Sequence, residues 1–462
     1  MRRRSQLALA IFSTSVLSAC ANFSAGNLFS HYSAQNQALY QSVKSGEYQQ
    51  AQQSLNESVA GDILDNFEKG RVAILNQDYS DGKAFLEKSD QAVRVEQEKA
   101  TISLSDTATS VGSLAVNDNL NIYRPADYEL GFLHLYLGLT YVHSNDLEGA
   151  LVEMRRANQV QEQARKDREA QLESAQKEMA SQGLSPNLGS ILANYPDAGK
   201  TLQSVQNGYL FYLSALLYEA SGDINSAYVD YRRALAVSPD NQDVIDGTKR
   251  AAKRLGMSQD LSLLEQRYGK VQPLPNGKSR VIVIAEQGVV KALDGWKQAL
   301  PIFDSKGGTA WYSMALPYYR DTPKQTFAPL QLNQQTMDSE VLVDVDAMAA
   351  RDLTERMPAL ILRQALRVVA KEQLRRQAAK DDVGNLLFNV WNTLTEQPDT
   401  RSWLTLPEQV NSASRVVSPG KQVLTVGGQD YSFDVAQGRT VLVWLSQQGN
   451  NSTIWHKQLG RL

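Results

Sequence analysis

The stretch that decides the fold reads FYLSALLYEASGDINSAYVDYRRALAVSP and runs from residue 211 to residue 239. On either side of a Ser221-Gly222-Asp223 break, apolar residues recur at three- and four-residue steps, which predicts one buried stripe on each of two helices. Gly222 suits the tight turn because it can adopt a positive φ without a Cβ clash. Pro239 cannot continue a helix and marks the end of the second one. The stretch therefore predicts two short helices packed side by side.

The same spacing recurs three times upstream. The best copy runs from Leu137 to Ala157, and weaker copies begin near Gly70 and Gly46. These anchor positions resemble the tetratricopeptide (TPR) repeat, in which small residues such as Ala215 let the two helices approach closely. A single hairpin cannot bury its apolar face alone, and about three stacked units are needed. We therefore expect a TPR-like α-solenoid over residues 31–270; the alternative is a set of ordinary helical hairpins.

Residues 1–20 have the features of a secretory leader, with arginines followed by a short apolar run. The run ends in Leu17-Ser18-Ala19-Cys20, which resembles the bacterial lipoprotein signal. That resemblance implies cleavage before Cys20, the only cysteine of the chain, and attachment of acyl chains such as palmitate to it. Ala21 rather than aspartate follows, so the resemblance implies a lipid anchor in the outer membrane, on the periplasmic face. Residues 21–30 would form a tether; the alternative is a plain secretory signal.

The composition excludes several classes of function. A net charge of −3 gives no electrostatic reason to bind nucleic acid. One cysteine allows neither an internal disulfide nor a multi-thiolate zinc site. The sequence contains no Walker loop, Gly-x-Ser-x-Gly elbow or dinucleotide fingerprint. Its histidines also lack metal-ligand spacing: they are His31, His134, His143 and His456. We expect no metal, no cofactor and no enzymatic activity, and His134 is predicted to lie in the core.

The composition shifts after a linker at 271–278, because all six tryptophans follow it. At 462 residues the chain is too long for a single core. A second domain over residues 279–462 is therefore expected, with an antiparallel sheet packed on helices. The predicted fold class is mainly α, with an N-terminal TPR-like solenoid followed by this smaller α+β domain. Its elements are strands at 279–286 and 340–346, a helix over 351–379 and short strands after residue 410.

TPR arrays resemble one another in binding partners with the inner face of the first helix of each repeat. In this chain that face is largely apolar, and large exposed apolar patches are rare in soluble proteins. We therefore expect an occupant, which is the 101–124 insertion, the second domain or a segment of a partner. The inner positions proposed as partner contacts are Phe132, Leu135, Leu139, Val142, Tyr209, Tyr212 and Leu216.

Two further groups of residues are candidate sites. In the run from Asp399 to Trp403, Arg401 and Trp403 are of the types that anchor protein interfaces. A structural turn, with Asp399 as a cap and the indole buried, is favoured over this interface role. Asp344 and Asp346 would share one face of a strand, a spacing that suits acid–base catalysis or metal binding. A solvated strand face without such a function is favoured.

Four runs of residues together resemble an uncharacterised group of Gram-negative, TPR-containing outer-membrane lipoproteins. The resemblance implies an architecture and a location but no activity. We predict a non-catalytic scaffold or assembly factor that binds an envelope protein. The alternative is a glycan- or peptidoglycan-binding protein, or an enzyme, with its site in the domain after residue 278. The runs are Leu17–Cys20, Tyr128-Glu129-Leu130, Glu153-x-Arg155-Arg156, and Asp399–Trp403 with Leu404-x-Leu406-Pro407.

Overall fold

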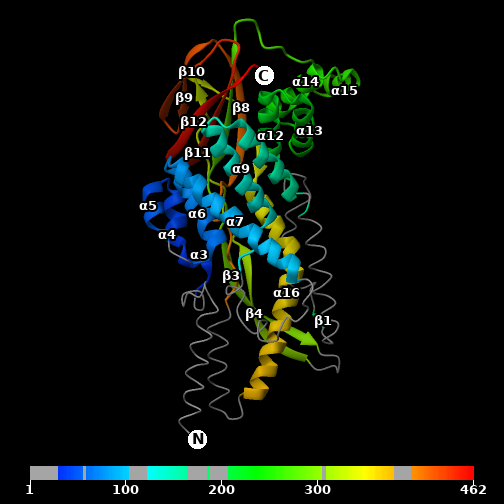
Figure 1. Ribbon diagram of the computed structural model, residues 1–462. Helices are drawn as coiled ribbons and strands as arrows, with labels where there is room; N and C mark the ends of the chain where they lie inside the picture. The colour runs from blue at the N-terminus through cyan, green and yellow to red at the C-terminus, as the bar shows by residue number, and fades with distance from the viewer. Residues whose placement is uncertain are drawn as a thin grey trace.

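The computed structural model describes residues 30–55, 59–103, 122–161, 163, 185–186, 206–303, 309–378 and 397–462. Up to residue 268 the described elements are helices, apart from the two-residue strand β1, and most strands follow (Figure 1). The leader, the lipidation site Cys20 and most of the 101–124 insertion lie outside the described residues. Within the described residues, no helix combines the length and the apolar run that crossing a bilayer requires.

The helices pair as hairpins in the region where TPR-like repeats are predicted. Neighbouring helices along the chain contact each other from one end of the array to the other. The clearest pairs are α6 (Asp62–Leu75) with α7 (Tyr79–Ser103), and α12 (Gly208–Ser221) with α13 (Ile224–Val237). The other helices before the linker are α3 (Tyr32–Gln35), α4 (Gln37–Lys44), α5 (Tyr48–Gln53), α9 (Asp127–His143), the helical stretch over 147–161, α14 (Gln242–Arg254) and α15 (Ser258–Tyr268).

The hairpin turns share one backbone feature. Gly222 ends α12 with a φ of 88°, in the left-handed region where glycine carries no steric penalty. Gln77 and Asn145 occupy the corresponding turns upstream with φ values of 66° and 64°. The repeated spacing in the sequence therefore corresponds to a repeated turn geometry, even where glycine is replaced.

The central sheet has five strands, and its middle strand β2 pairs with β8 on one side and β11 on the other. The β2–β8 pair is antiparallel as expected, but β2 and β11 run parallel, which the predicted antiparallel sheet did not include. A parallel pair is possible because no tight turn joins these strands, which lie far apart in the sequence. In pairing order the strands are β12 (Asn451–Gly460), β11 (Thr440–Gln448), β2 (Ser279–Gln287), β8 (Gln409–Val417) and β7 (Glu340–Asp344).

Two smaller sheets complete the strands. The four-stranded one packs on the face of the central sheet that bears Val281 and Val283, and together they form a second core. In pairing order its strands are β10 (Gln429–Val435), β9 (Gly420–Val426), β5 (Gln331–Leu332) and β6 (Gln335–Thr336). The three-stranded sheet contains β1 (Ser185–Pro186), β3 (Leu293–Phe303) and β4 (Thr309–Tyr319).

The long helix α16 (Val345–Ala378) begins earlier than the sequence suggests and continues through Pro358. Strand β7 consequently ends at Asp344, and Asp344 and Asp346 do not share a strand face. Asp344 instead accepts a hydrogen bond from the Ala347 N–H at the start of the helix (3.0 Å), as helix-capping residues do. Asp346 is buried and accepts one from the Lys291 N–H (2.8 Å). Both carboxylates therefore stabilise the strand-to-helix junction.

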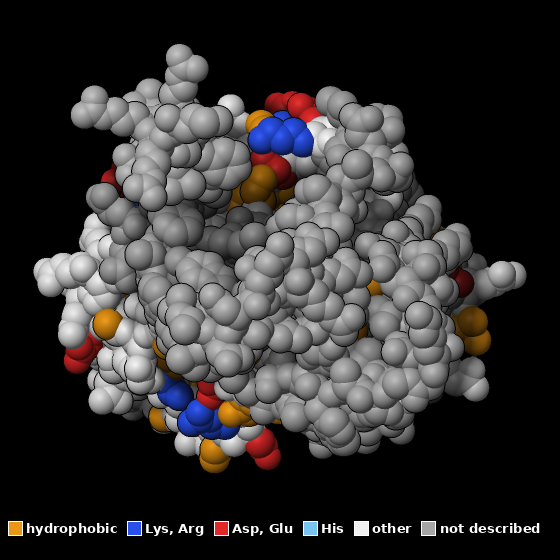
Figure 2. Space-filling model, turned by 90° about the horizontal axis from the view of Figure 1, so that it is seen from below, with side chains coloured by type: hydrophobic (Ala, Val, Ile, Leu, Met, Phe, Trp, Pro, Cys, Tyr) orange, Lys and Arg blue, Asp and Glu red, His pale blue; other side chains and the backbone are white. Residues whose placement is uncertain are grey.

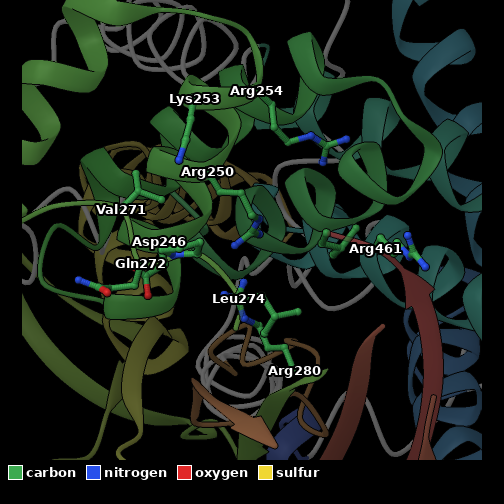
Figure 3. Close-up of a pocket in the computed structure, with 11 residues that line it drawn as sticks. Asp246, Arg250, Lys253, Arg254, Val271, Gln272, Leu274, Arg280 and Arg461 are labelled. Carbon is green, nitrogen blue, oxygen red and sulfur yellow. The ribbon is translucent and has the colours of Figure 1, made fainter. Parts of the chain in front are cut away.

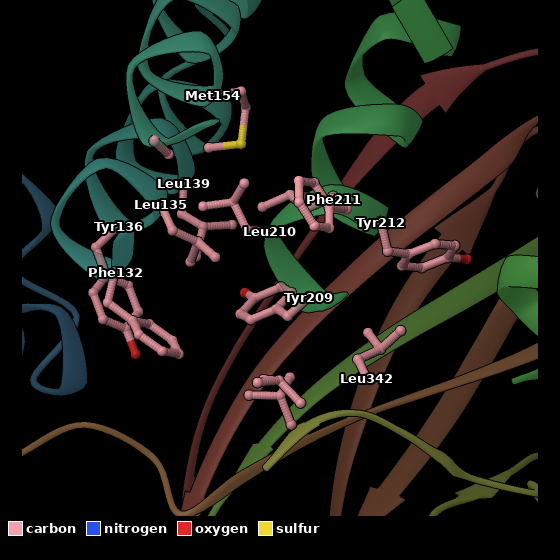
Figure 4. Packing of buried hydrophobic residues seen from close by; sticks show 14 of the residues in the cluster. Phe132, Leu135, Tyr136, Leu139, Met154, Tyr209, Leu210, Phe211, Tyr212 and Leu342 are labelled. Atoms are coloured by element: carbon pink, nitrogen blue, oxygen red, sulfur yellow. The ribbon is translucent and has the colours of Figure 1, made fainter. Parts of the chain in front are cut away.

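The main core is continuous from the helices into the central sheet. Phe132 and Tyr209 from the helices, Leu342 from β7 and Trp444 from β11 belong to one buried cluster, part of which Figure 4 shows. The linker at 271–278 therefore marks a change of secondary structure, while the core passes across it. The helices, the central sheet and the four-stranded sheet form three successive layers.

Candidate functional site

The inner face of the helix array holds a segment of the same chain, residues 399–406, which we call the groove segment and which turns at Leu404 and Thr405. The Trp403 N–H donates to Oε1 of Glu129 on α9 (2.7 Å), and the Leu404 N–H donates to Oε1 of Glu68 on α6 (2.6 Å). The Thr405 hydroxyl donates to the other oxygen of Glu68 (2.6 Å). Two carboxylates on neighbouring hairpins thus bind the backbone of consecutive residues.

Trp403 is the apolar anchor of the groove segment. Its indole is fully buried and stacks on Phe67 of α6, with ring centroids 4.4 Å apart and an interplanar angle of 18°. Tyr136 of α9 meets it edge-on at 5.8 Å. The indole N–H donates to the Thr405 hydroxyl (3.0 Å), so the buried polar atom is satisfied. Trp403 therefore attaches the segment to two hairpins at once.

Arg401 is neutralised beside this anchor. Its guanidinium donates from Nε and Nη2 to the two oxygens of Asp399, at 2.8 and 2.7 Å. The same guanidinium lies 5.6 Å from the ring centroid of Tyr123. Arg401 and Trp403 are thus used inside the chain, as the favoured interpretation of this run, a structural turn, predicts. Thr400 extends the contact, since its carbonyl accepts from the Ser33 hydroxyl (3.2 Å).

A fully buried ion pair joins the helices to the sheet behind the groove segment. Nη2 of Arg71 on α6 lies 2.6 Å from Oε2 of Glu286 on β2, and neither side chain is exposed. The other oxygen of Glu286 accepts from the Tyr209 hydroxyl (3.2 Å) and the Trp444 indole N–H (3.1 Å). The Arg71 guanidinium also lies over the ring of Tyr136, 4.5 Å from its centroid. Burial alone would lower the pKa of the Arg71 guanidinium. The Glu286 carboxylate raises this pKa by more than burial lowers it, so the guanidinium stays charged.

The seven inner positions proposed as partner contacts are covered within the protein. Their exposed fractions range from 0 to 6%, so they are not an open surface in this structure. Part of this cover comes from the second half of the chain, because the Tyr209 hydroxyl reaches Glu286 on β2 and Leu342 of β7 belongs to the same cluster. Leu135 and Leu139 instead lie beside Leu210 of the next hairpin (Figure 4). The seven residues are Phe132, Leu135, Leu139, Val142, Tyr209, Tyr212 and Leu216.

The groove carboxylates have raised pKa values without access to a substrate. Burial raises the pKa of Glu68 to about 8 and that of Glu129 to about 6, although hydrogen bonds from the groove segment oppose the change. Raised carboxyl pKa values often mark general acids in active sites. Here the side chains are 2% and 1% exposed, and the oxygens accept hydrogen bonds from the chain itself. Their role is to hold backbone amides.

His134 lies in the core, as its position in the repeat predicts. It is 4% exposed, and its Nδ1 lies 2.7 Å from a carboxylate oxygen of Glu153 on the adjacent helical stretch. In the described part of the chain, no group of three or more histidine, cysteine, aspartate or glutamate residues could hold a metal ion.

Sequence reasoning missed Arg71, Glu286 and the groove carboxylates. One signal could have pointed to Glu286: in the strand SRVIVIAEQ, it shares a face with Ile282 and Ile284. A charged residue on a face that is otherwise apolar requires a partner. The partner itself, Arg71, lies 215 residues away along the chain, and no local pattern names it.

No protein-family model matches the sequence, and no curated protein matches it. Solved structures that resemble it include MamA AMB-1, at 14% identity over 51% of this chain and 87% of that chain, with a TM-score of 0.28. Another crystal structure of a MamA protein matches at 10% identity over 53% and 97%, with a TM-score of 0.27. The TPR2AB domain of yeast Sti1, in complex with pHSP90, matches at 10% over 50% and 87%, with a TM-score of 0.20. At such TM-scores the TPR-like assignment rests on the helix pairing and turns of this chain.

Proposed function

We propose that this protein is a non-catalytic scaffold or assembly factor that binds another protein of a bacterial cell envelope. In this proposal Cys20 carries the lipid anchor and holds the protein on the periplasmic face of the outer membrane. The lipoprotein-type sequence before Cys20 supports the anchor. The TPR-like hairpins support a protein partner, because stacked helical repeats present extended surfaces for binding.

The partner site is placed at the open end of the array, since the inner groove is already filled. Helices α13 and α15 border a pocket of about 560 Å³ there. Leu263 on α15 lines this pocket and is 66% exposed, more than any other large apolar side chain found exposed among the described residues. Leu235, Pro239 and Tyr268 add apolar surface to the same pocket. This exposed apolar groove is the observation that carries the proposal.

The chemistry of the groove indicates what would bind it. Its apolar floor suits a partner segment with an apolar stripe, such as an amphipathic helix. Arg232 and Arg267 stand against a single acidic residue, Asp260, so the rim is positive and suits acidic residues beside the stripe. At the opposite end of the molecule, the described side chains visible in Figure 2 form small mixed groups of apolar, basic and acidic residues.

The binding test compares two exposed apolar positions. We would cross-link intact cells that carry the full chain, its Leu263→Gln variant or its Val416→Gln variant. Val416 is 44% exposed on β8, does not line this pocket, and is the matched control. One defined protein should be cross-linked to the parent and to Val416→Gln and should be lost from Leu263→Gln. Identical products from all three chains would contradict the proposed site.

The anchor is tested separately. Cells grown with an alkyne analogue of palmitate should label the parent chain, and the label should sediment with the outer membrane. Cys20→Ser should abolish both the label and the sedimentation. A labelled Cys20→Ser variant, or a parent chain recovered from the cytosol, would refute the proposed anchor and location.

A further inference from the structure

A second pocket, of about 390 Å³, lies where helix α14, the linker and the first residues of β2 meet the last residues of the sequence. Five basic residues line it: Arg250, Lys253, Arg254, Arg280 and Arg461. Figure 3 shows the three residues of α14 together with Arg280 from the sheet and Arg461 from the end of the chain, all around one opening. This is unusual in a chain whose net charge is −3.

Two of the five cations are oriented by a buried carboxylate. Arg250 donates from Nε and Nη2 to the two oxygens of Glu219, at 2.8 and 2.7 Å. Arg254 donates to one of the same oxygens (3.0 Å), and the Tyr231 hydroxyl donates to the other (2.7 Å). Because the Glu219 side chain is fully buried, it fixes both guanidinium groups at the pocket wall. One carboxylate neutralises only one of these two cations.

The other three cations, Lys253, Arg280 and Arg461, have side chains with no hydrogen bond or ion pair to any described residue. The acidic residue in the lining, Asp246, has no ion pair with these three cations, although its charge opposes the lowering of the Arg280 pKa. Its Oδ1 accepts from the Gln242 side chain (3.0 Å) and lies 3.2 Å from the Lys249 ammonium. The five cationic side chains of the lining therefore face two carboxylate side chains, those of Glu219 and Asp246. The pocket keeps an excess of positive charge.

The strand position of Arg280 fixes the direction of its side chain toward this pocket. It sits in the middle strand of the central sheet, where its N–H donates to the Arg439 carbonyl (3.0 Å). Strand alternation places its side chain on the helix-facing side with Ile282 and Ile284. Burial lowers the pKa of the Arg280 guanidinium, and the positive charge of Arg250 lowers it further. Two guanidinium groups held together in this way are stabilised by an anion between them.

We propose that this pocket binds the phosphate group of a small phosphomonoester or of a phosphate-bearing lipid headgroup. A phosphate monoester carries nearly two negative charges and three peripheral oxygens, so it can accept from several cations at once. A carboxylate carries one negative charge and two oxygens, so it offsets less of the positive charge of this pocket. Val271, Pro273 and Leu274 form an apolar wall for the neutral part of the ligand. The volume lies within the range of about 300–1,000 Å³ that small-molecule sites occupy.

The test uses the full chain in detergent micelles at constant ionic strength. Calorimetric titration with inorganic phosphate and with glycerol 3-phosphate should show saturable binding, and acetate at the same concentration should not compete. Arg280→Gln should weaken binding about tenfold or more, as the loss of a charge-assisted hydrogen bond does. Lys253→Gln should weaken it several-fold without touching the sheet, which guards against a folding defect. Lys421→Gln, on an exposed position of β9, is the charge-matched control and should leave binding unchanged.

A second arm identifies the source of the phosphate. Phosphatidic acid mixed into the micelles is compared with diacylglycerol, which lacks the phosphate. Tight, Arg280-dependent binding of glycerol 3-phosphate indicates a soluble ligand, whereas binding that requires phosphatidic acid indicates a lipid headgroup. The proposal is overturned if the parent chain binds neither glycerol 3-phosphate nor phosphatidic acid, or if acetate competes as well as phosphate. It is also overturned if Arg280→Gln and Lys253→Gln bind these ligands like the parent.

Discussion

The structure of the buried Arg71–Glu286 pair predicts that substituting one partner costs more stability than substituting the other. In Glu286→Gln the Arg71 guanidinium stays charged, because its pKa is far above neutral, and it remains fully buried with no carboxylate. The Thr405 carbonyl and the Ser446 hydroxyl still accept from it, but its Nη1 has no partner among the described residues. In Arg71→Met the carboxylate is left alone, but three neutral donors still reach it, from Tyr136, Tyr209 and Trp444. Removing one partner of a buried pair costs about 3–5 kcal/mol. We expect Glu286→Gln to lower the free energy of unfolding by an amount near the upper end of this range, and Arg71→Met by an amount near the lower end.

The pH dependence separates the two variants further. In Arg71→Met the Glu286 carboxylate stays fully buried without its cation, and an unpaired buried negative charge lowers the stability of the fold until acid neutralises it. The stability lost by this variant should therefore return as the pH falls toward 4. The loss in Glu286→Gln should be independent of pH, because arginine does not release its proton in this range. The double variant Arg71→Met/Glu286→Gln should lose much less stability than the sum of the losses in the two single variants, because it contains no unpaired buried charge.

Urea unfolding at pH 4, 5.5 and 7 measures these differences. Tryptophan fluorescence reports on the second half of the chain, which holds all six tryptophans, and far-ultraviolet circular dichroism reports mainly on the helices. Both signals should change at one urea concentration, because the pair and the continuous core link the halves. Lys99→Met, which breaks an exposed pair with Glu96, should cost less than about 1 kcal/mol. Losses below about 1 kcal/mol in both pair variants, or separate transitions for the two signals, would refute the reasoning.

Three further substitutions test other contacts. Burial raises the pKa of Glu68 to about 8, above its unfolded value, so its ionisation destabilises the fold as the pH rises. Glu68→Gln should therefore exceed the parent in stability by a few kcal/mol at pH 9 and match it at pH 4; a parallel pH profile for both chains would contradict this. Trp403→Ala should lower stability by about 3–5 kcal/mol in urea titrations, and a loss below 1 kcal/mol would contradict its role as anchor. A Cβ on Gly208 would collide with the Leu342 carbonyl, whereas on Gly131 its nearest contact is 4.0 Å away. Gly208→Ala should therefore lower the melting temperature and Gly131→Ala should not; equal effects would argue against this packing.

The local parts of the fold were predictable because their causes are local. The apolar period of 211–239 and the break at Gly222 predicted α12, its turn and α13 within a few residues. Strand 279–286 followed from its β-branched residues. The start of α16 was missed because EVLVDVD alternates like a strand to its end, while Asp344 acts as the helix cap.

The filling of the groove was not predictable in the same way. The sequence showed an apolar inner face and therefore required an occupant, but it offered three candidates of equal standing. The contacts that decide between them join distant residues: Glu68 meets Thr405 across 337 positions, and Glu129 meets Trp403 across 274. Every residue except proline can donate its backbone N–H, so the sequence does not show which residues make such hydrogen bonds. The run from Asp399 to Trp403 stood out by its composition, but its partners did not.

The way in which the groove is filled bears on how such a protein could act. Glu68 and Glu129 hold backbone amides of the groove segment, and backbone amides are the same in any peptide. Specificity for the segment therefore comes from Trp403, whose indole stacks on Phe67. A foreign peptide would have to displace that indole and also the central sheet, to which Arg71 is joined. The inner groove consequently stabilises the protein, and the partner surface that we propose is the one at the end of the array, where Leu263 is exposed.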